Sequence, residues 1–506
     1  MGMQKKKNRT KQVCSLAALL LMLITVFSCF GAAAASENEE QSNGTGKKYI
    51  IAMDTTFAPF EFEDSQGNRV GIDVELLEAI AKDQGFEYEA RAIGFDAALQ
   101  AVESGQADGI LAGCSITEER QKKMDFSTPY FDSGISMAVS KDNDSIQSYE
   151  DLRGKKVAVK VGTEGATLAN KLSEQYGFSV VTFDDSANMY EDVKLGNTAA
   201  CFEDYPVLGY AISQDIGLKL VGEKEAGSSY GLGVKKGQNA ELLQMFNDGL
   251  ENVKASGEYQ RILDSYISSG DGTAANVESN EGVNFFTLLG TTFPRFVQAA
   301  GVTLWITAVS LVFAVVLGLL FCALRLSKYK VLHAITRVYL WVIRGTPVIV
   351  QAFMIYFGIP KLLGFTMPVE VASIITLTLN AGAYLSEIFR SGIEAVDVGQ
   401  MEAARSLGLP YMKTMQKVIL PQAARIVIPS VINQFIITLK DSSILSVIGL
   451  AELTKVGKAI VAQNLESFNT YLILAIYYLI LVSLLTALSA VVERRLRRGK
   501  LKGKGN

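Results

Sequence analysis

Residues 49–113 read YIIAMDTTFAPFEFEDSQGNRVGIDVELLEAIAKDQGFEYEARAIGFDAALQAVESGQADGILAG. Short β-rich runs, such as YIIAMD at 49–54 and YEARAIG at 88–94, alternate with stretches of helical character, such as VELLEAIAKDQG at 74–85. Strands that alternate with helices favour α/β units around mostly parallel strands. The same rhythm continues to about Tyr266, so we expect an α/β domain over this part of the chain.

Four loops that directly follow predicted strands carry the informative polar residues. They come after YIIAMD, after ADGILAG, after KKVAVK and after AACFED. Ligands of such sheets bind at the carboxyl ends of strands, where loops meet the N-termini of helices. The planar guanidinium of Arg120 suits a carboxylate, and the carboxylate of Asp204 suits an ammonium group. Ser115 and Thr163 offer hydrogen-bond donors, and Phe57 and Phe95 offer apolar walls for the stem of a side chain.

Together these residues supply the charged groups, donors and apolar surface that suit a zwitterionic ligand. Taken singly, each also has a purely structural interpretation. An isolated arginine is typical of a solvated surface, an isolated phenylalanine is typical of a core, and TEER at 117–120 is typical of a helix cap. Spacing alone leaves both interpretations open.

The 506 residues divide by composition into two regions. Charged residues gather between residues 47 and 254, whereas long apolar runs begin only after Phe285. Five of these runs approach the ~20 residues that a bilayer requires. They are Gly301–Leu324, Val338–Ile359, Pro368–Phe389, Ile426–Leu450 and Tyr471–Val492. We therefore expect a multidomain chain: an α/β domain followed by an all-α membrane domain of about five transmembrane helices.

Basic residues predict the orientation of these spans. Arg325, Lys330 and Arg337 follow the first span, and the chain ends RRLRRGKLKGKGN. Lys and Arg gather on the cytoplasmic side of membrane proteins. An odd number of spans that starts outside ends inside, so we expect an extracytoplasmic α/β domain and a cytoplasmic C-terminus.

Residues 1–35 have a basic start, an apolar core of about 18 residues and a tail of small residues, which is typical of a secretory signal peptide. We expect cleavage near Ala35. Retention as a membrane anchor and lipidation at Cys29, within a loose lipobox at 26–29, remain alternatives.

Several function classes are excluded by what the sequence lacks. The chain holds a single histidine, His333, so a Ser-His or Cys-His hydrolase in the α/β domain would have no base. The five cysteines show no metal-ligand spacing. No GxxxxGK[ST] phosphate loop occurs in these residues, so we expect no catalytic residue, no metal and no cofactor in this chain. ATP and Mg²⁺ would be bound by a partner ATPase.

Three blocks resemble the family 3 solute-binding proteins for polar amino acids, and glutamine binders in particular. They are FAPFEFEDSQGNRVGIDVELLEAIA, LAGCSITEERQKKMDFSTPYFDSG and DLRGKKVAVKVGTEG. The resemblance implies a two-lobed clamshell over 48–268, with lobe one at 48–137 and 231–268 and lobe two at 138–230. It implies that Arg120 holds the ligand α-carboxylate with Ser115 and Thr163. Asp204 and the Gly113 carbonyl would take the α-ammonium group.

The resemblance also suggests how the ligand side chain is selected. Asp54 and Lys160 resemble a pair that binds a carboxamide, with Lys160 donating to its oxygen and Asp54 accepting from its nitrogen. An uncharged amide fits both charges, which favours glutamine. Glu203 departs from the residue type expected in glutamine binders, which leaves asparagine, glutamate, histidine or arginine open.

Residues 269–284 are rich in Gly, Ser, Asn and Thr and are typical of a flexible linker. In the membrane domain at 285–498, ahead of a basic tail at 499–506, the segment 399–429 resembles the EAA loop of ABC importer permeases. The matching residues are Glu402, Ala403, Ala404, Gly408 and Pro421, with helix breaks expected at Gly408 and Pro421. The implied role is a coupling helix seated on the ATPase. The pair Lys440 and Asp441 lies within the fourth span and is a candidate for pore charges.

The sequence therefore predicts a subunit for ATP-driven import of a polar amino acid, with glutamine as the first choice. A homodimeric permease with two ATPase subunits is expected, and no nucleic-acid partner. The alternative is a ligand-gated channel or a sensor that uses the same clamshell domain. No TVGYG-like filter and no further catalytic domain are found in this sequence.

Overall fold

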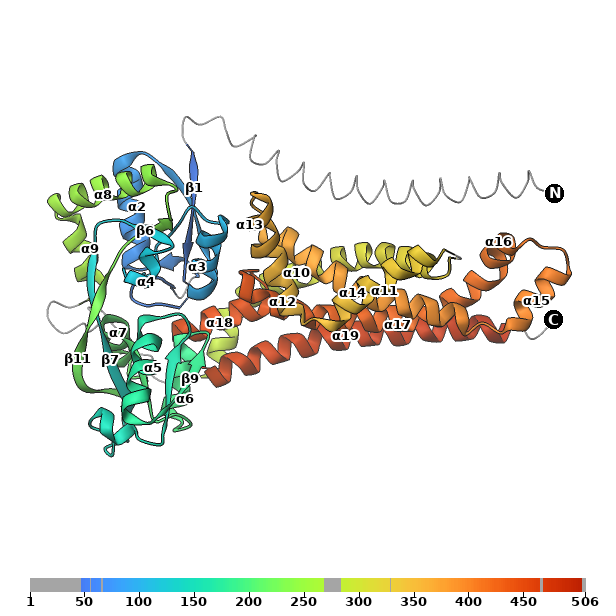
Figure 1. Cartoon of the computed structure of the whole chain (residues 1–506). Helices are drawn as coiled ribbons and strands as arrows, with labels where there is room; N and C mark the ends of the chain where they lie inside the picture. Colours follow the sequence, from blue (N-terminus) through green and yellow to red (C-terminus); the bar gives the residue numbers. More distant parts are fainter. Residues whose placement is uncertain are drawn as a thin grey trace. The chain divides into compact units, whose positions relative to one another are not determined.

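The computed structural model describes residues 47–54, 56–64, 67–267, 284–327, 329–464 and 467–502. The expected signal peptide at 1–35, nearly all of the expected linker at 269–284 and the last residues of the basic tail lie outside the described residues. The two α/β lobes and the long helices of the membrane region are shown in Figure 1.

The first lobe is built on a five-stranded sheet in the order β4-β1-β5-β12-β6. β1 and β5 are parallel, and β12 runs antiparallel to both of its neighbours. Side chains of α2 and α8 pack with those of β1 in one buried cluster that includes Ile51, Leu76 and Phe246. The elements are β1 (Lys48–Met53), β4 (Glu87–Ala92), β5 (Gly109–Ile110), β6 (Met124–Phe126), β12 (Gly233–Lys235), α2 (Ile72–Gln84), α3 (Phe95–Ser104), α4 (Glu118–Gln121), α8 (Ala240–Ala255) and α9 (Glu258–Tyr266), with the small pair β2 (Phe62–Glu63) and β3 (Arg69–Val70).

The second lobe is built on the sheet β11-β7-β10-β8-β9. β8 is parallel to β9 and β10, whereas β7 runs antiparallel to β10 and β11. Helices cover this sheet through two buried clusters, one around Phe202 and the other around Met189. The elements are β7 (Phe131–Ser140), β8 (Lys156–Lys160), β9 (Ser179–Phe183), β10 (Ala200–Asp204), β11 (Leu218–Tyr230), α5 (Glu164–Tyr176), α6 (Ser186–Lys194) and α7 (Tyr205–Ser213), with the short 3-10 helix η1 (Tyr149–Leu152).

The long strands β7 and β11 form the connection between the two sheets. Their ladder extends to Ser229 opposite Asp132 and to Tyr230 opposite Phe131. The strands approach closely at two glycines, because a Cβ atom added to Gly227 would lie 2.7 Å from the Cα of Gly134. The two-lobed α/β fold with paired strand crossings confirms the predicted clamshell.

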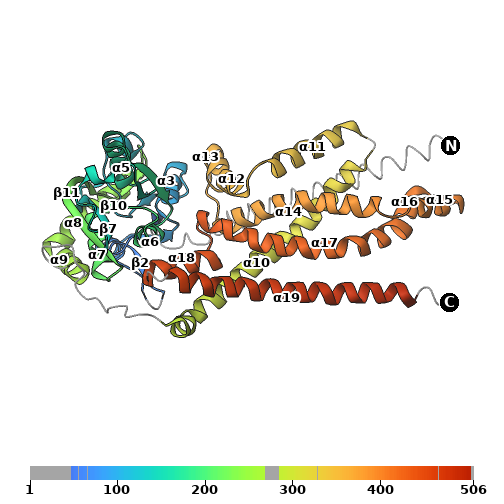
Figure 2. The same ribbon diagram turned by 90° about the horizontal axis from the view of Figure 1, so that it is seen from below.

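In the described residues of the C-terminal region, all the regular secondary structure is helical. Helices α14, α17 and α19 run beside one another in both views (Figures 1 and 2), and α10 packs along α14. The elements are α10 (Phe285–Arg325), α11 (Lys330–Gly345), α12 (Val348–Phe353), η2 (Met354–Gly358), α13 (Ile359–Leu363), α14 (Val369–Glu394), α15 (Val398–Ser406), α16 (Tyr411–Thr414), η3 (Met415–Ile419), α17 (Leu420–Asp441), η4 (Ser442–Ile448), α18 (Leu453–Asn464) and α19 (Ser467–Lys502).

Among the described residues, four helices are long and apolar enough to cross a membrane, or five if the bent pair α11 and α12–α13 counts as one span. The predicted span Val338–Ile359 is not one continuous helix, because the chain bends by 108° between Gly345 and Val348. The reason is Pro347, which precedes α12: proline has no backbone N–H and disfavours helical geometry at the preceding residue, Thr346.

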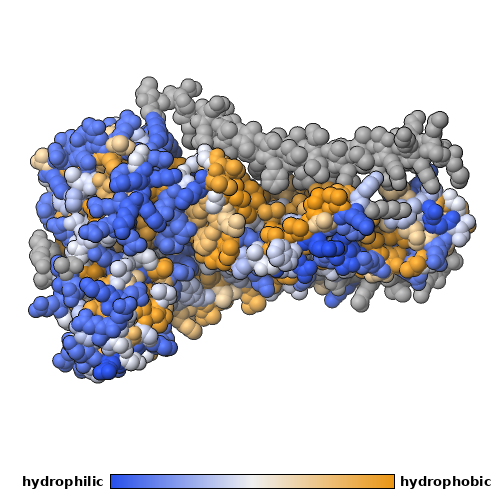
Figure 3. Space-filling view, in the orientation of Figure 1, coloured by the Kyte–Doolittle hydropathy of each residue, from blue (hydrophilic) through white to orange (hydrophobic). Residues whose placement is uncertain are grey.

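The surface agrees with membrane insertion of this region. Large apolar side chains are exposed along the helices, for example Trp341, Leu362 and Leu479. Figure 3 shows hydrophobic residues gathered over the helices, while hydrophilic residues dominate the visible face of the α/β lobes. Exposed apolar surface on this scale needs an apolar environment such as lipid.

The expected break at Pro421 is also wrong. The helix that begins at Tyr411 continues through Pro421 to Ile448. A π-helical turn, η3, lies immediately before α17 and places Pro421 in the first turn of that helix. Because a π-turn changes the hydrogen-bond register and a first-turn proline needs no N–H donor, the helix is not interrupted. The expected break at Gly408 is present, with φ at 84°.

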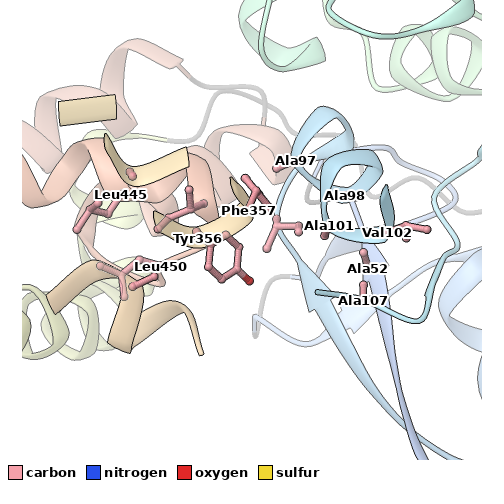
Figure 4. Packing of buried hydrophobic residues seen from close by; sticks show 14 of the residues in the cluster. Ala52, Ala97, Ala98, Ala101, Val102, Ala107, Tyr356, Phe357, Leu445 and Leu450 are labelled. Carbon is pink, nitrogen blue, oxygen red and sulfur yellow. The ribbon is translucent and has the colours of Figure 1, made fainter. Parts of the chain in front are cut away.

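One buried apolar cluster combines side chains of the first lobe with side chains of the helical region. Alanines of α3 face Tyr356, Phe357 and Leu450 (Figure 4). Polar contacts accompany them: Gln106 Oε1 accepts from the backbone N–H of Met367 at 2.9 Å, and Lys455 Nζ donates to the carbonyl of Ala92 at 2.6 Å. Helix α3 thus contributes to the packing of both regions.

Candidate ligand site

The loop after β1 and the loop after β5 form the first-lobe side of the candidate site. Asp54 follows β1 and is buried, and Phe57 is 4% exposed. Gly113 has φ at 51°, and a Cβ atom there would lie 2.2 Å from Phe57 Cε1. Only glycine fits both this backbone conformation and the adjacent ring. The backbone therefore approaches the aromatic wall as closely as packing allows.

Arg120 extends from the first lobe to the second. Its backbone N–H donates a hydrogen bond to Oγ1 of Thr117, the N-cap residue, and this bond fixes the start of α4. The guanidinium donates from Nη1 to the Ser115 carbonyl at 2.8 Å and from Nη2 to the Gly162 carbonyl at 3.0 Å. It also lies 5.1 Å from the centre of the Phe95 ring. Arg120 is therefore held in place by two carbonyls and an aromatic face, one of the carbonyls belonging to the opposite lobe.

Asp54 and Lys160 meet directly in an ion pair that joins the lobes. Lys160 ends β8 and is 1% exposed, and its Nζ lies 5.2 Å from the centre of the Phe57 ring. The sequence suggested that these two residues bind opposite ends of a carboxamide, and the structure places them in contact with each other. Since both are buried, the pair is shielded from solvent screening.

Glu203 and Asp204 end β10 and form the acidic side of the site. Glu203 accepts hydrogen bonds from Ser186 Oγ at 2.7 Å and from the Asp204 N–H at 3.2 Å. Asp204 accepts a hydrogen bond from the hydroxyl of Tyr230. Burial, followed by repulsion from Glu203, raises the pKa of Asp204 to about 8. Burial raises the pKa of Glu203 as well. An incoming cationic group would stabilise the ionised form of Asp204.

Thr163 provides structural support at the second lobe. Its Oγ1 accepts from the Ala166 N–H at 3.2 Å as the N-cap of α5 and donates to the Lys160 carbonyl at 2.8 Å. This arrangement holds the N-terminus of α5 beside Gly162 and Lys160. The predicted residues of the two lobes are thus brought into one site.

Family models match both regions of this chain. Residues 49–269 match bacterial extracellular solute-binding proteins of family 3, and residues 310–498 match the inner membrane component of binding-protein-dependent transport systems. The arginine transport system permease protein ArtQ of Bacillus subtilis is 37% identical over 40% of this chain and 93% of its own length. The glutamine transport system permease protein GlnP of Escherichia coli is 36% identical over 40% of this chain and 94% of its own length.

The chain belongs to the amino-acid ABC importer family. It is a solute-binding domain fused to a permease domain, a transporter component and not an enzyme. An ancestral arginine-binding protein bound to arginine is 40% identical with a TM-score of 0.41, over 43% of this chain and 97% of that one. The second substrate-binding domain of Lactococcus lactis GlnP is 42% identical with a TM-score of 0.36, over 45% and 98%.

In this importer subunit, the EAA-like segment forms a short hairpin. Ala404 is buried, and Met401 packs with Ile419 and Ala423. Glu402 and Ala403 remain exposed, and Leu407 is 84% exposed. The left-handed backbone at Gly408 turns the chain from α15 towards α16. The hairpin thus presents α15 outward on the permease domain.

Lys440 and Asp441 lie at the end of α17, where the α-helix changes to the 3-10 helix η4. Lys440 is exposed and Asp441 is partly buried. Their proposed role as pore charges stays a prediction.

Sequence reasoning missed three groups that the importer fold brings to the site. Tyr230 is fully buried at the end of β11 and contacts Asp204 and Phe57. Glu61 and Asp73 lie buried behind Gly113. Their only sequence signal was charge inside an apolar segment.

Proposed function

We propose that this chain imports a free amino acid, with glutamine as its ligand, and works with a separate ATPase subunit. The single observation that carries the ligand proposal is the meeting of Arg120, Asp204 and the Asp54–Lys160 pair in one interlobe site.

The two poles of a zwitterion find complementary charges in this site. The Arg120 guanidinium, fixed by the Ser115 and Gly162 carbonyls, would hold an α-carboxylate. Asp204, already hydrogen-bonded to Tyr230, would hold an α-ammonium group together with the Gly113 carbonyl. Phe57 and Phe95 would cover the aliphatic part of the ligand.

The side-chain end of the site favours a neutral amide. Lys160 and Asp54 neutralise each other, and burial raises the pKa of the neighbouring Glu203. A cationic side chain would need an unpaired carboxylate, and an anionic side chain would need an unpaired cation. A carboxamide can donate to Asp54 and accept from Lys160 without adding charge.

The energy source and the assembly follow from the permease domain. The exposed α15 face with Glu402, Ala403 and Leu407 would bind a groove of the ATPase, and Gly408 would allow the turn behind it. Because the described residues of one permease domain supply four or five spans, we propose a homodimer with two ATPase subunits. The binding domain would lie outside the cell membrane and the C-terminus inside.

Isothermal titration calorimetry of the detergent-solubilised chain tests the ligand. We expect tight binding of glutamine, weaker binding of asparagine and glutamate, and at least hundredfold weaker binding of arginine. Arg120→Ala should abolish glutamine binding because it removes a charge-assisted bidentate contact. Tight arginine binding with weak glutamine binding would refute the glutamine assignment, and undiminished glutamine affinity in Arg120→Ala would refute the carboxylate contact.

A further inference from the structure

Two carboxyl groups lie buried behind the candidate ligand loops of the first lobe and have no role in the proposed contacts. Glu61 and Asp73 are both 0% exposed. Glu61 follows the loop that carries Phe57, to whose backbone it is hydrogen-bonded. Asp73 lies in the first turn of α2. Buried carboxyl groups are costly unless they are paired, so this placement needs an explanation.

Asp73 supports the backbone of the ligand loop. Its Oδ2 accepts from the Gly113 N–H at 2.8 Å and from the Tyr130 hydroxyl at 2.9 Å. Gly113 is the residue whose left-handed backbone brings the loop against Phe57. Two hydrogen bonds to one oxygen favour the ionised form of Asp73.

Glu61 lacks such support. Within the described residues, no donor group reaches either of its carboxyl oxygens or Asp73 Oδ1. The Asp73 N–H donates to the carbonyl of Phe60, the residue before Glu61, at 2.9 Å, so the two acidic residues lie on adjacent backbone segments. Two neighbouring buried carboxyl groups that lack other donors can satisfy each other only if a proton lies between them.

The surrounding charges do not offer another solution. Asp54, Lys160 and Arg69 face Glu61. Lys160 is already paired with Asp54, and Arg69 interacts more strongly with Glu63. Tyr130 faces Asp73 and is itself buried. Two adjacent buried carboxylates repel each other when the nearby cations already have acidic partners of their own. Burial and this repulsion raise the pKa of Glu61, and burial raises the pKa of Asp73.

We propose that Glu61 and Asp73 share one proton, with Glu61 as the donor and Asp73 as the acceptor, and that this shared proton positions the Gly113 loop for the ligand. The effect on binding rests on the proposed amino-acid site, because Gly113 and Ser115 are its first-lobe contacts. Glu61 is a positioning residue and does not touch the ligand.

Loss of the shared proton would act in two ways. The second negative charge would repel Asp73 and weaken its hold on the Gly113 N–H. It would also compete with Asp54 for Lys160, which joins the lobes. Both effects lower ligand affinity as the pH rises through the titration of the pair. The contribution of the pair to folding stability depends on pH in the same direction as ligand affinity. It is present at low pH and is lost as the pH rises through the raised pKa values of the folded state.

The Glu61→Gln variant separates the effect of ionisation from the effect of the hydrogen bond. The amide nitrogen donates to Asp73 as the protonated carboxyl does, but it cannot ionise. Glutamine affinity of the full chain in nanodiscs would be measured by calorimetry from pH 6 to pH 10. Because the ammonium group of free glutamine titrates in the same alkaline range, the readout is the ratio of the wild-type Kd to the Glu61→Gln Kd. We expect this ratio to rise about tenfold, the effect of one hydrogen bond to a charged group.

Two further variants sharpen the test. Glu87→Gln removes the same charge from an exposed position on the same lobe, so its Kd ratio to wild type should stay constant with pH. Tyr130→Phe removes a donor that stabilises ionised Asp73, so the rise in Kd should move to higher pH. A constant wild-type to Glu61→Gln ratio across the whole range would overturn the proposal.

A second readout does not depend on the ligand. The midpoint of thermal unfolding of the binding domain should fall more steeply with rising pH in wild type than in Glu61→Gln, because the other buried acids titrate in both proteins. If no amino acid binds the wild-type chain, the proposed function fails and this unfolding difference still decides whether the proton is shared. Parallel unfolding profiles of the two proteins would overturn the shared proton.

Discussion

The ion pair between Asp54 and Lys160 joins two lobes, so its removal should impair ligand binding far more than folding. Both groups are almost completely buried in the structure. Removing one partner of a buried ion pair costs about 3–5 kcal/mol, because the remaining charge stays desolvated. In an open cleft both groups would be hydrated, so each lobe would fold without the pair.

The perturbation is Lys160→Met, which keeps the length of the side chain and removes its charge. If closure loses about 3 kcal/mol, the Kd for glutamine rises more than a hundredfold. The thermal unfolding midpoint of the ligand-free protein should change little. Calorimetry of the solubilised chain gives the Kd, and fluorescence transfer between labels on the two lobes reports closure.

Two controls make this prediction specific. Lys156→Met makes the same change at the exposed start of β8 and should leave the Kd unchanged. Asp54→Asn combined with Lys160→Met removes both charges and should recover part of the lost affinity, since no uncompensated charge stays buried. An unchanged Kd for Lys160→Met, or a loss of thermal stability without loss of affinity, would show that the pair does not control closure.

Three further predictions address other parts of the chain. Gly113→Ala forces a Cβ atom against Phe57 and puts an alanine in the left-handed region of the backbone, so the affinity for glutamine, measured by calorimetry, should fall at least tenfold. Gly85→Ala is the control: a Cβ atom there meets no atom within 4 Å, so the affinity should be retained. Because the pKa of Asp204 is raised to about 8, ligand binding at pH 7 should release a proton. This release is measured as a dependence of the binding heat on the ionisation enthalpy of the buffer, and Asp204→Asn should abolish it. Gly408→Trp should leave glutamine binding intact but uncouple ATP hydrolysis from uptake in proteoliposomes, whereas Ser406→Ala should not; normal uptake by Gly408→Trp would contradict the coupling role.

Much of the fold was predictable because its signals are local. Alternating strand and helix patterns predicted the α/β lobes, and runs of ~20 apolar residues predicted the membrane helices. Gly408 was correctly predicted as a break, since a left-handed backbone position favours glycine. Pro347 shows the limit of such signals: hydropathy continued across it, and the bend of 108° interrupted the expected span.

Pro421 shows the same limit in the opposite direction. Proline usually ends a helix, but here the π-turn of η3 lets the helix continue. Whether a helix tolerates proline depends on hydrogen bonds one turn away and on packing against α15, which residue preferences do not encode.

For the site, the sequence by itself determined which chemical groups were available: one arginine, several carboxylates and a lysine at the ends of strands. Only the tertiary structure decided how they pair. Lys160 reaches Asp54 across 106 residues of sequence, and Tyr130 reaches Asp73 across 57. A local pattern cannot specify such partners, because burial and charge depend on which distant strands fold side by side. The same reason explains why Glu61 and Asp73 look like ordinary surface acids in the sequence and are buried in the folded lobe.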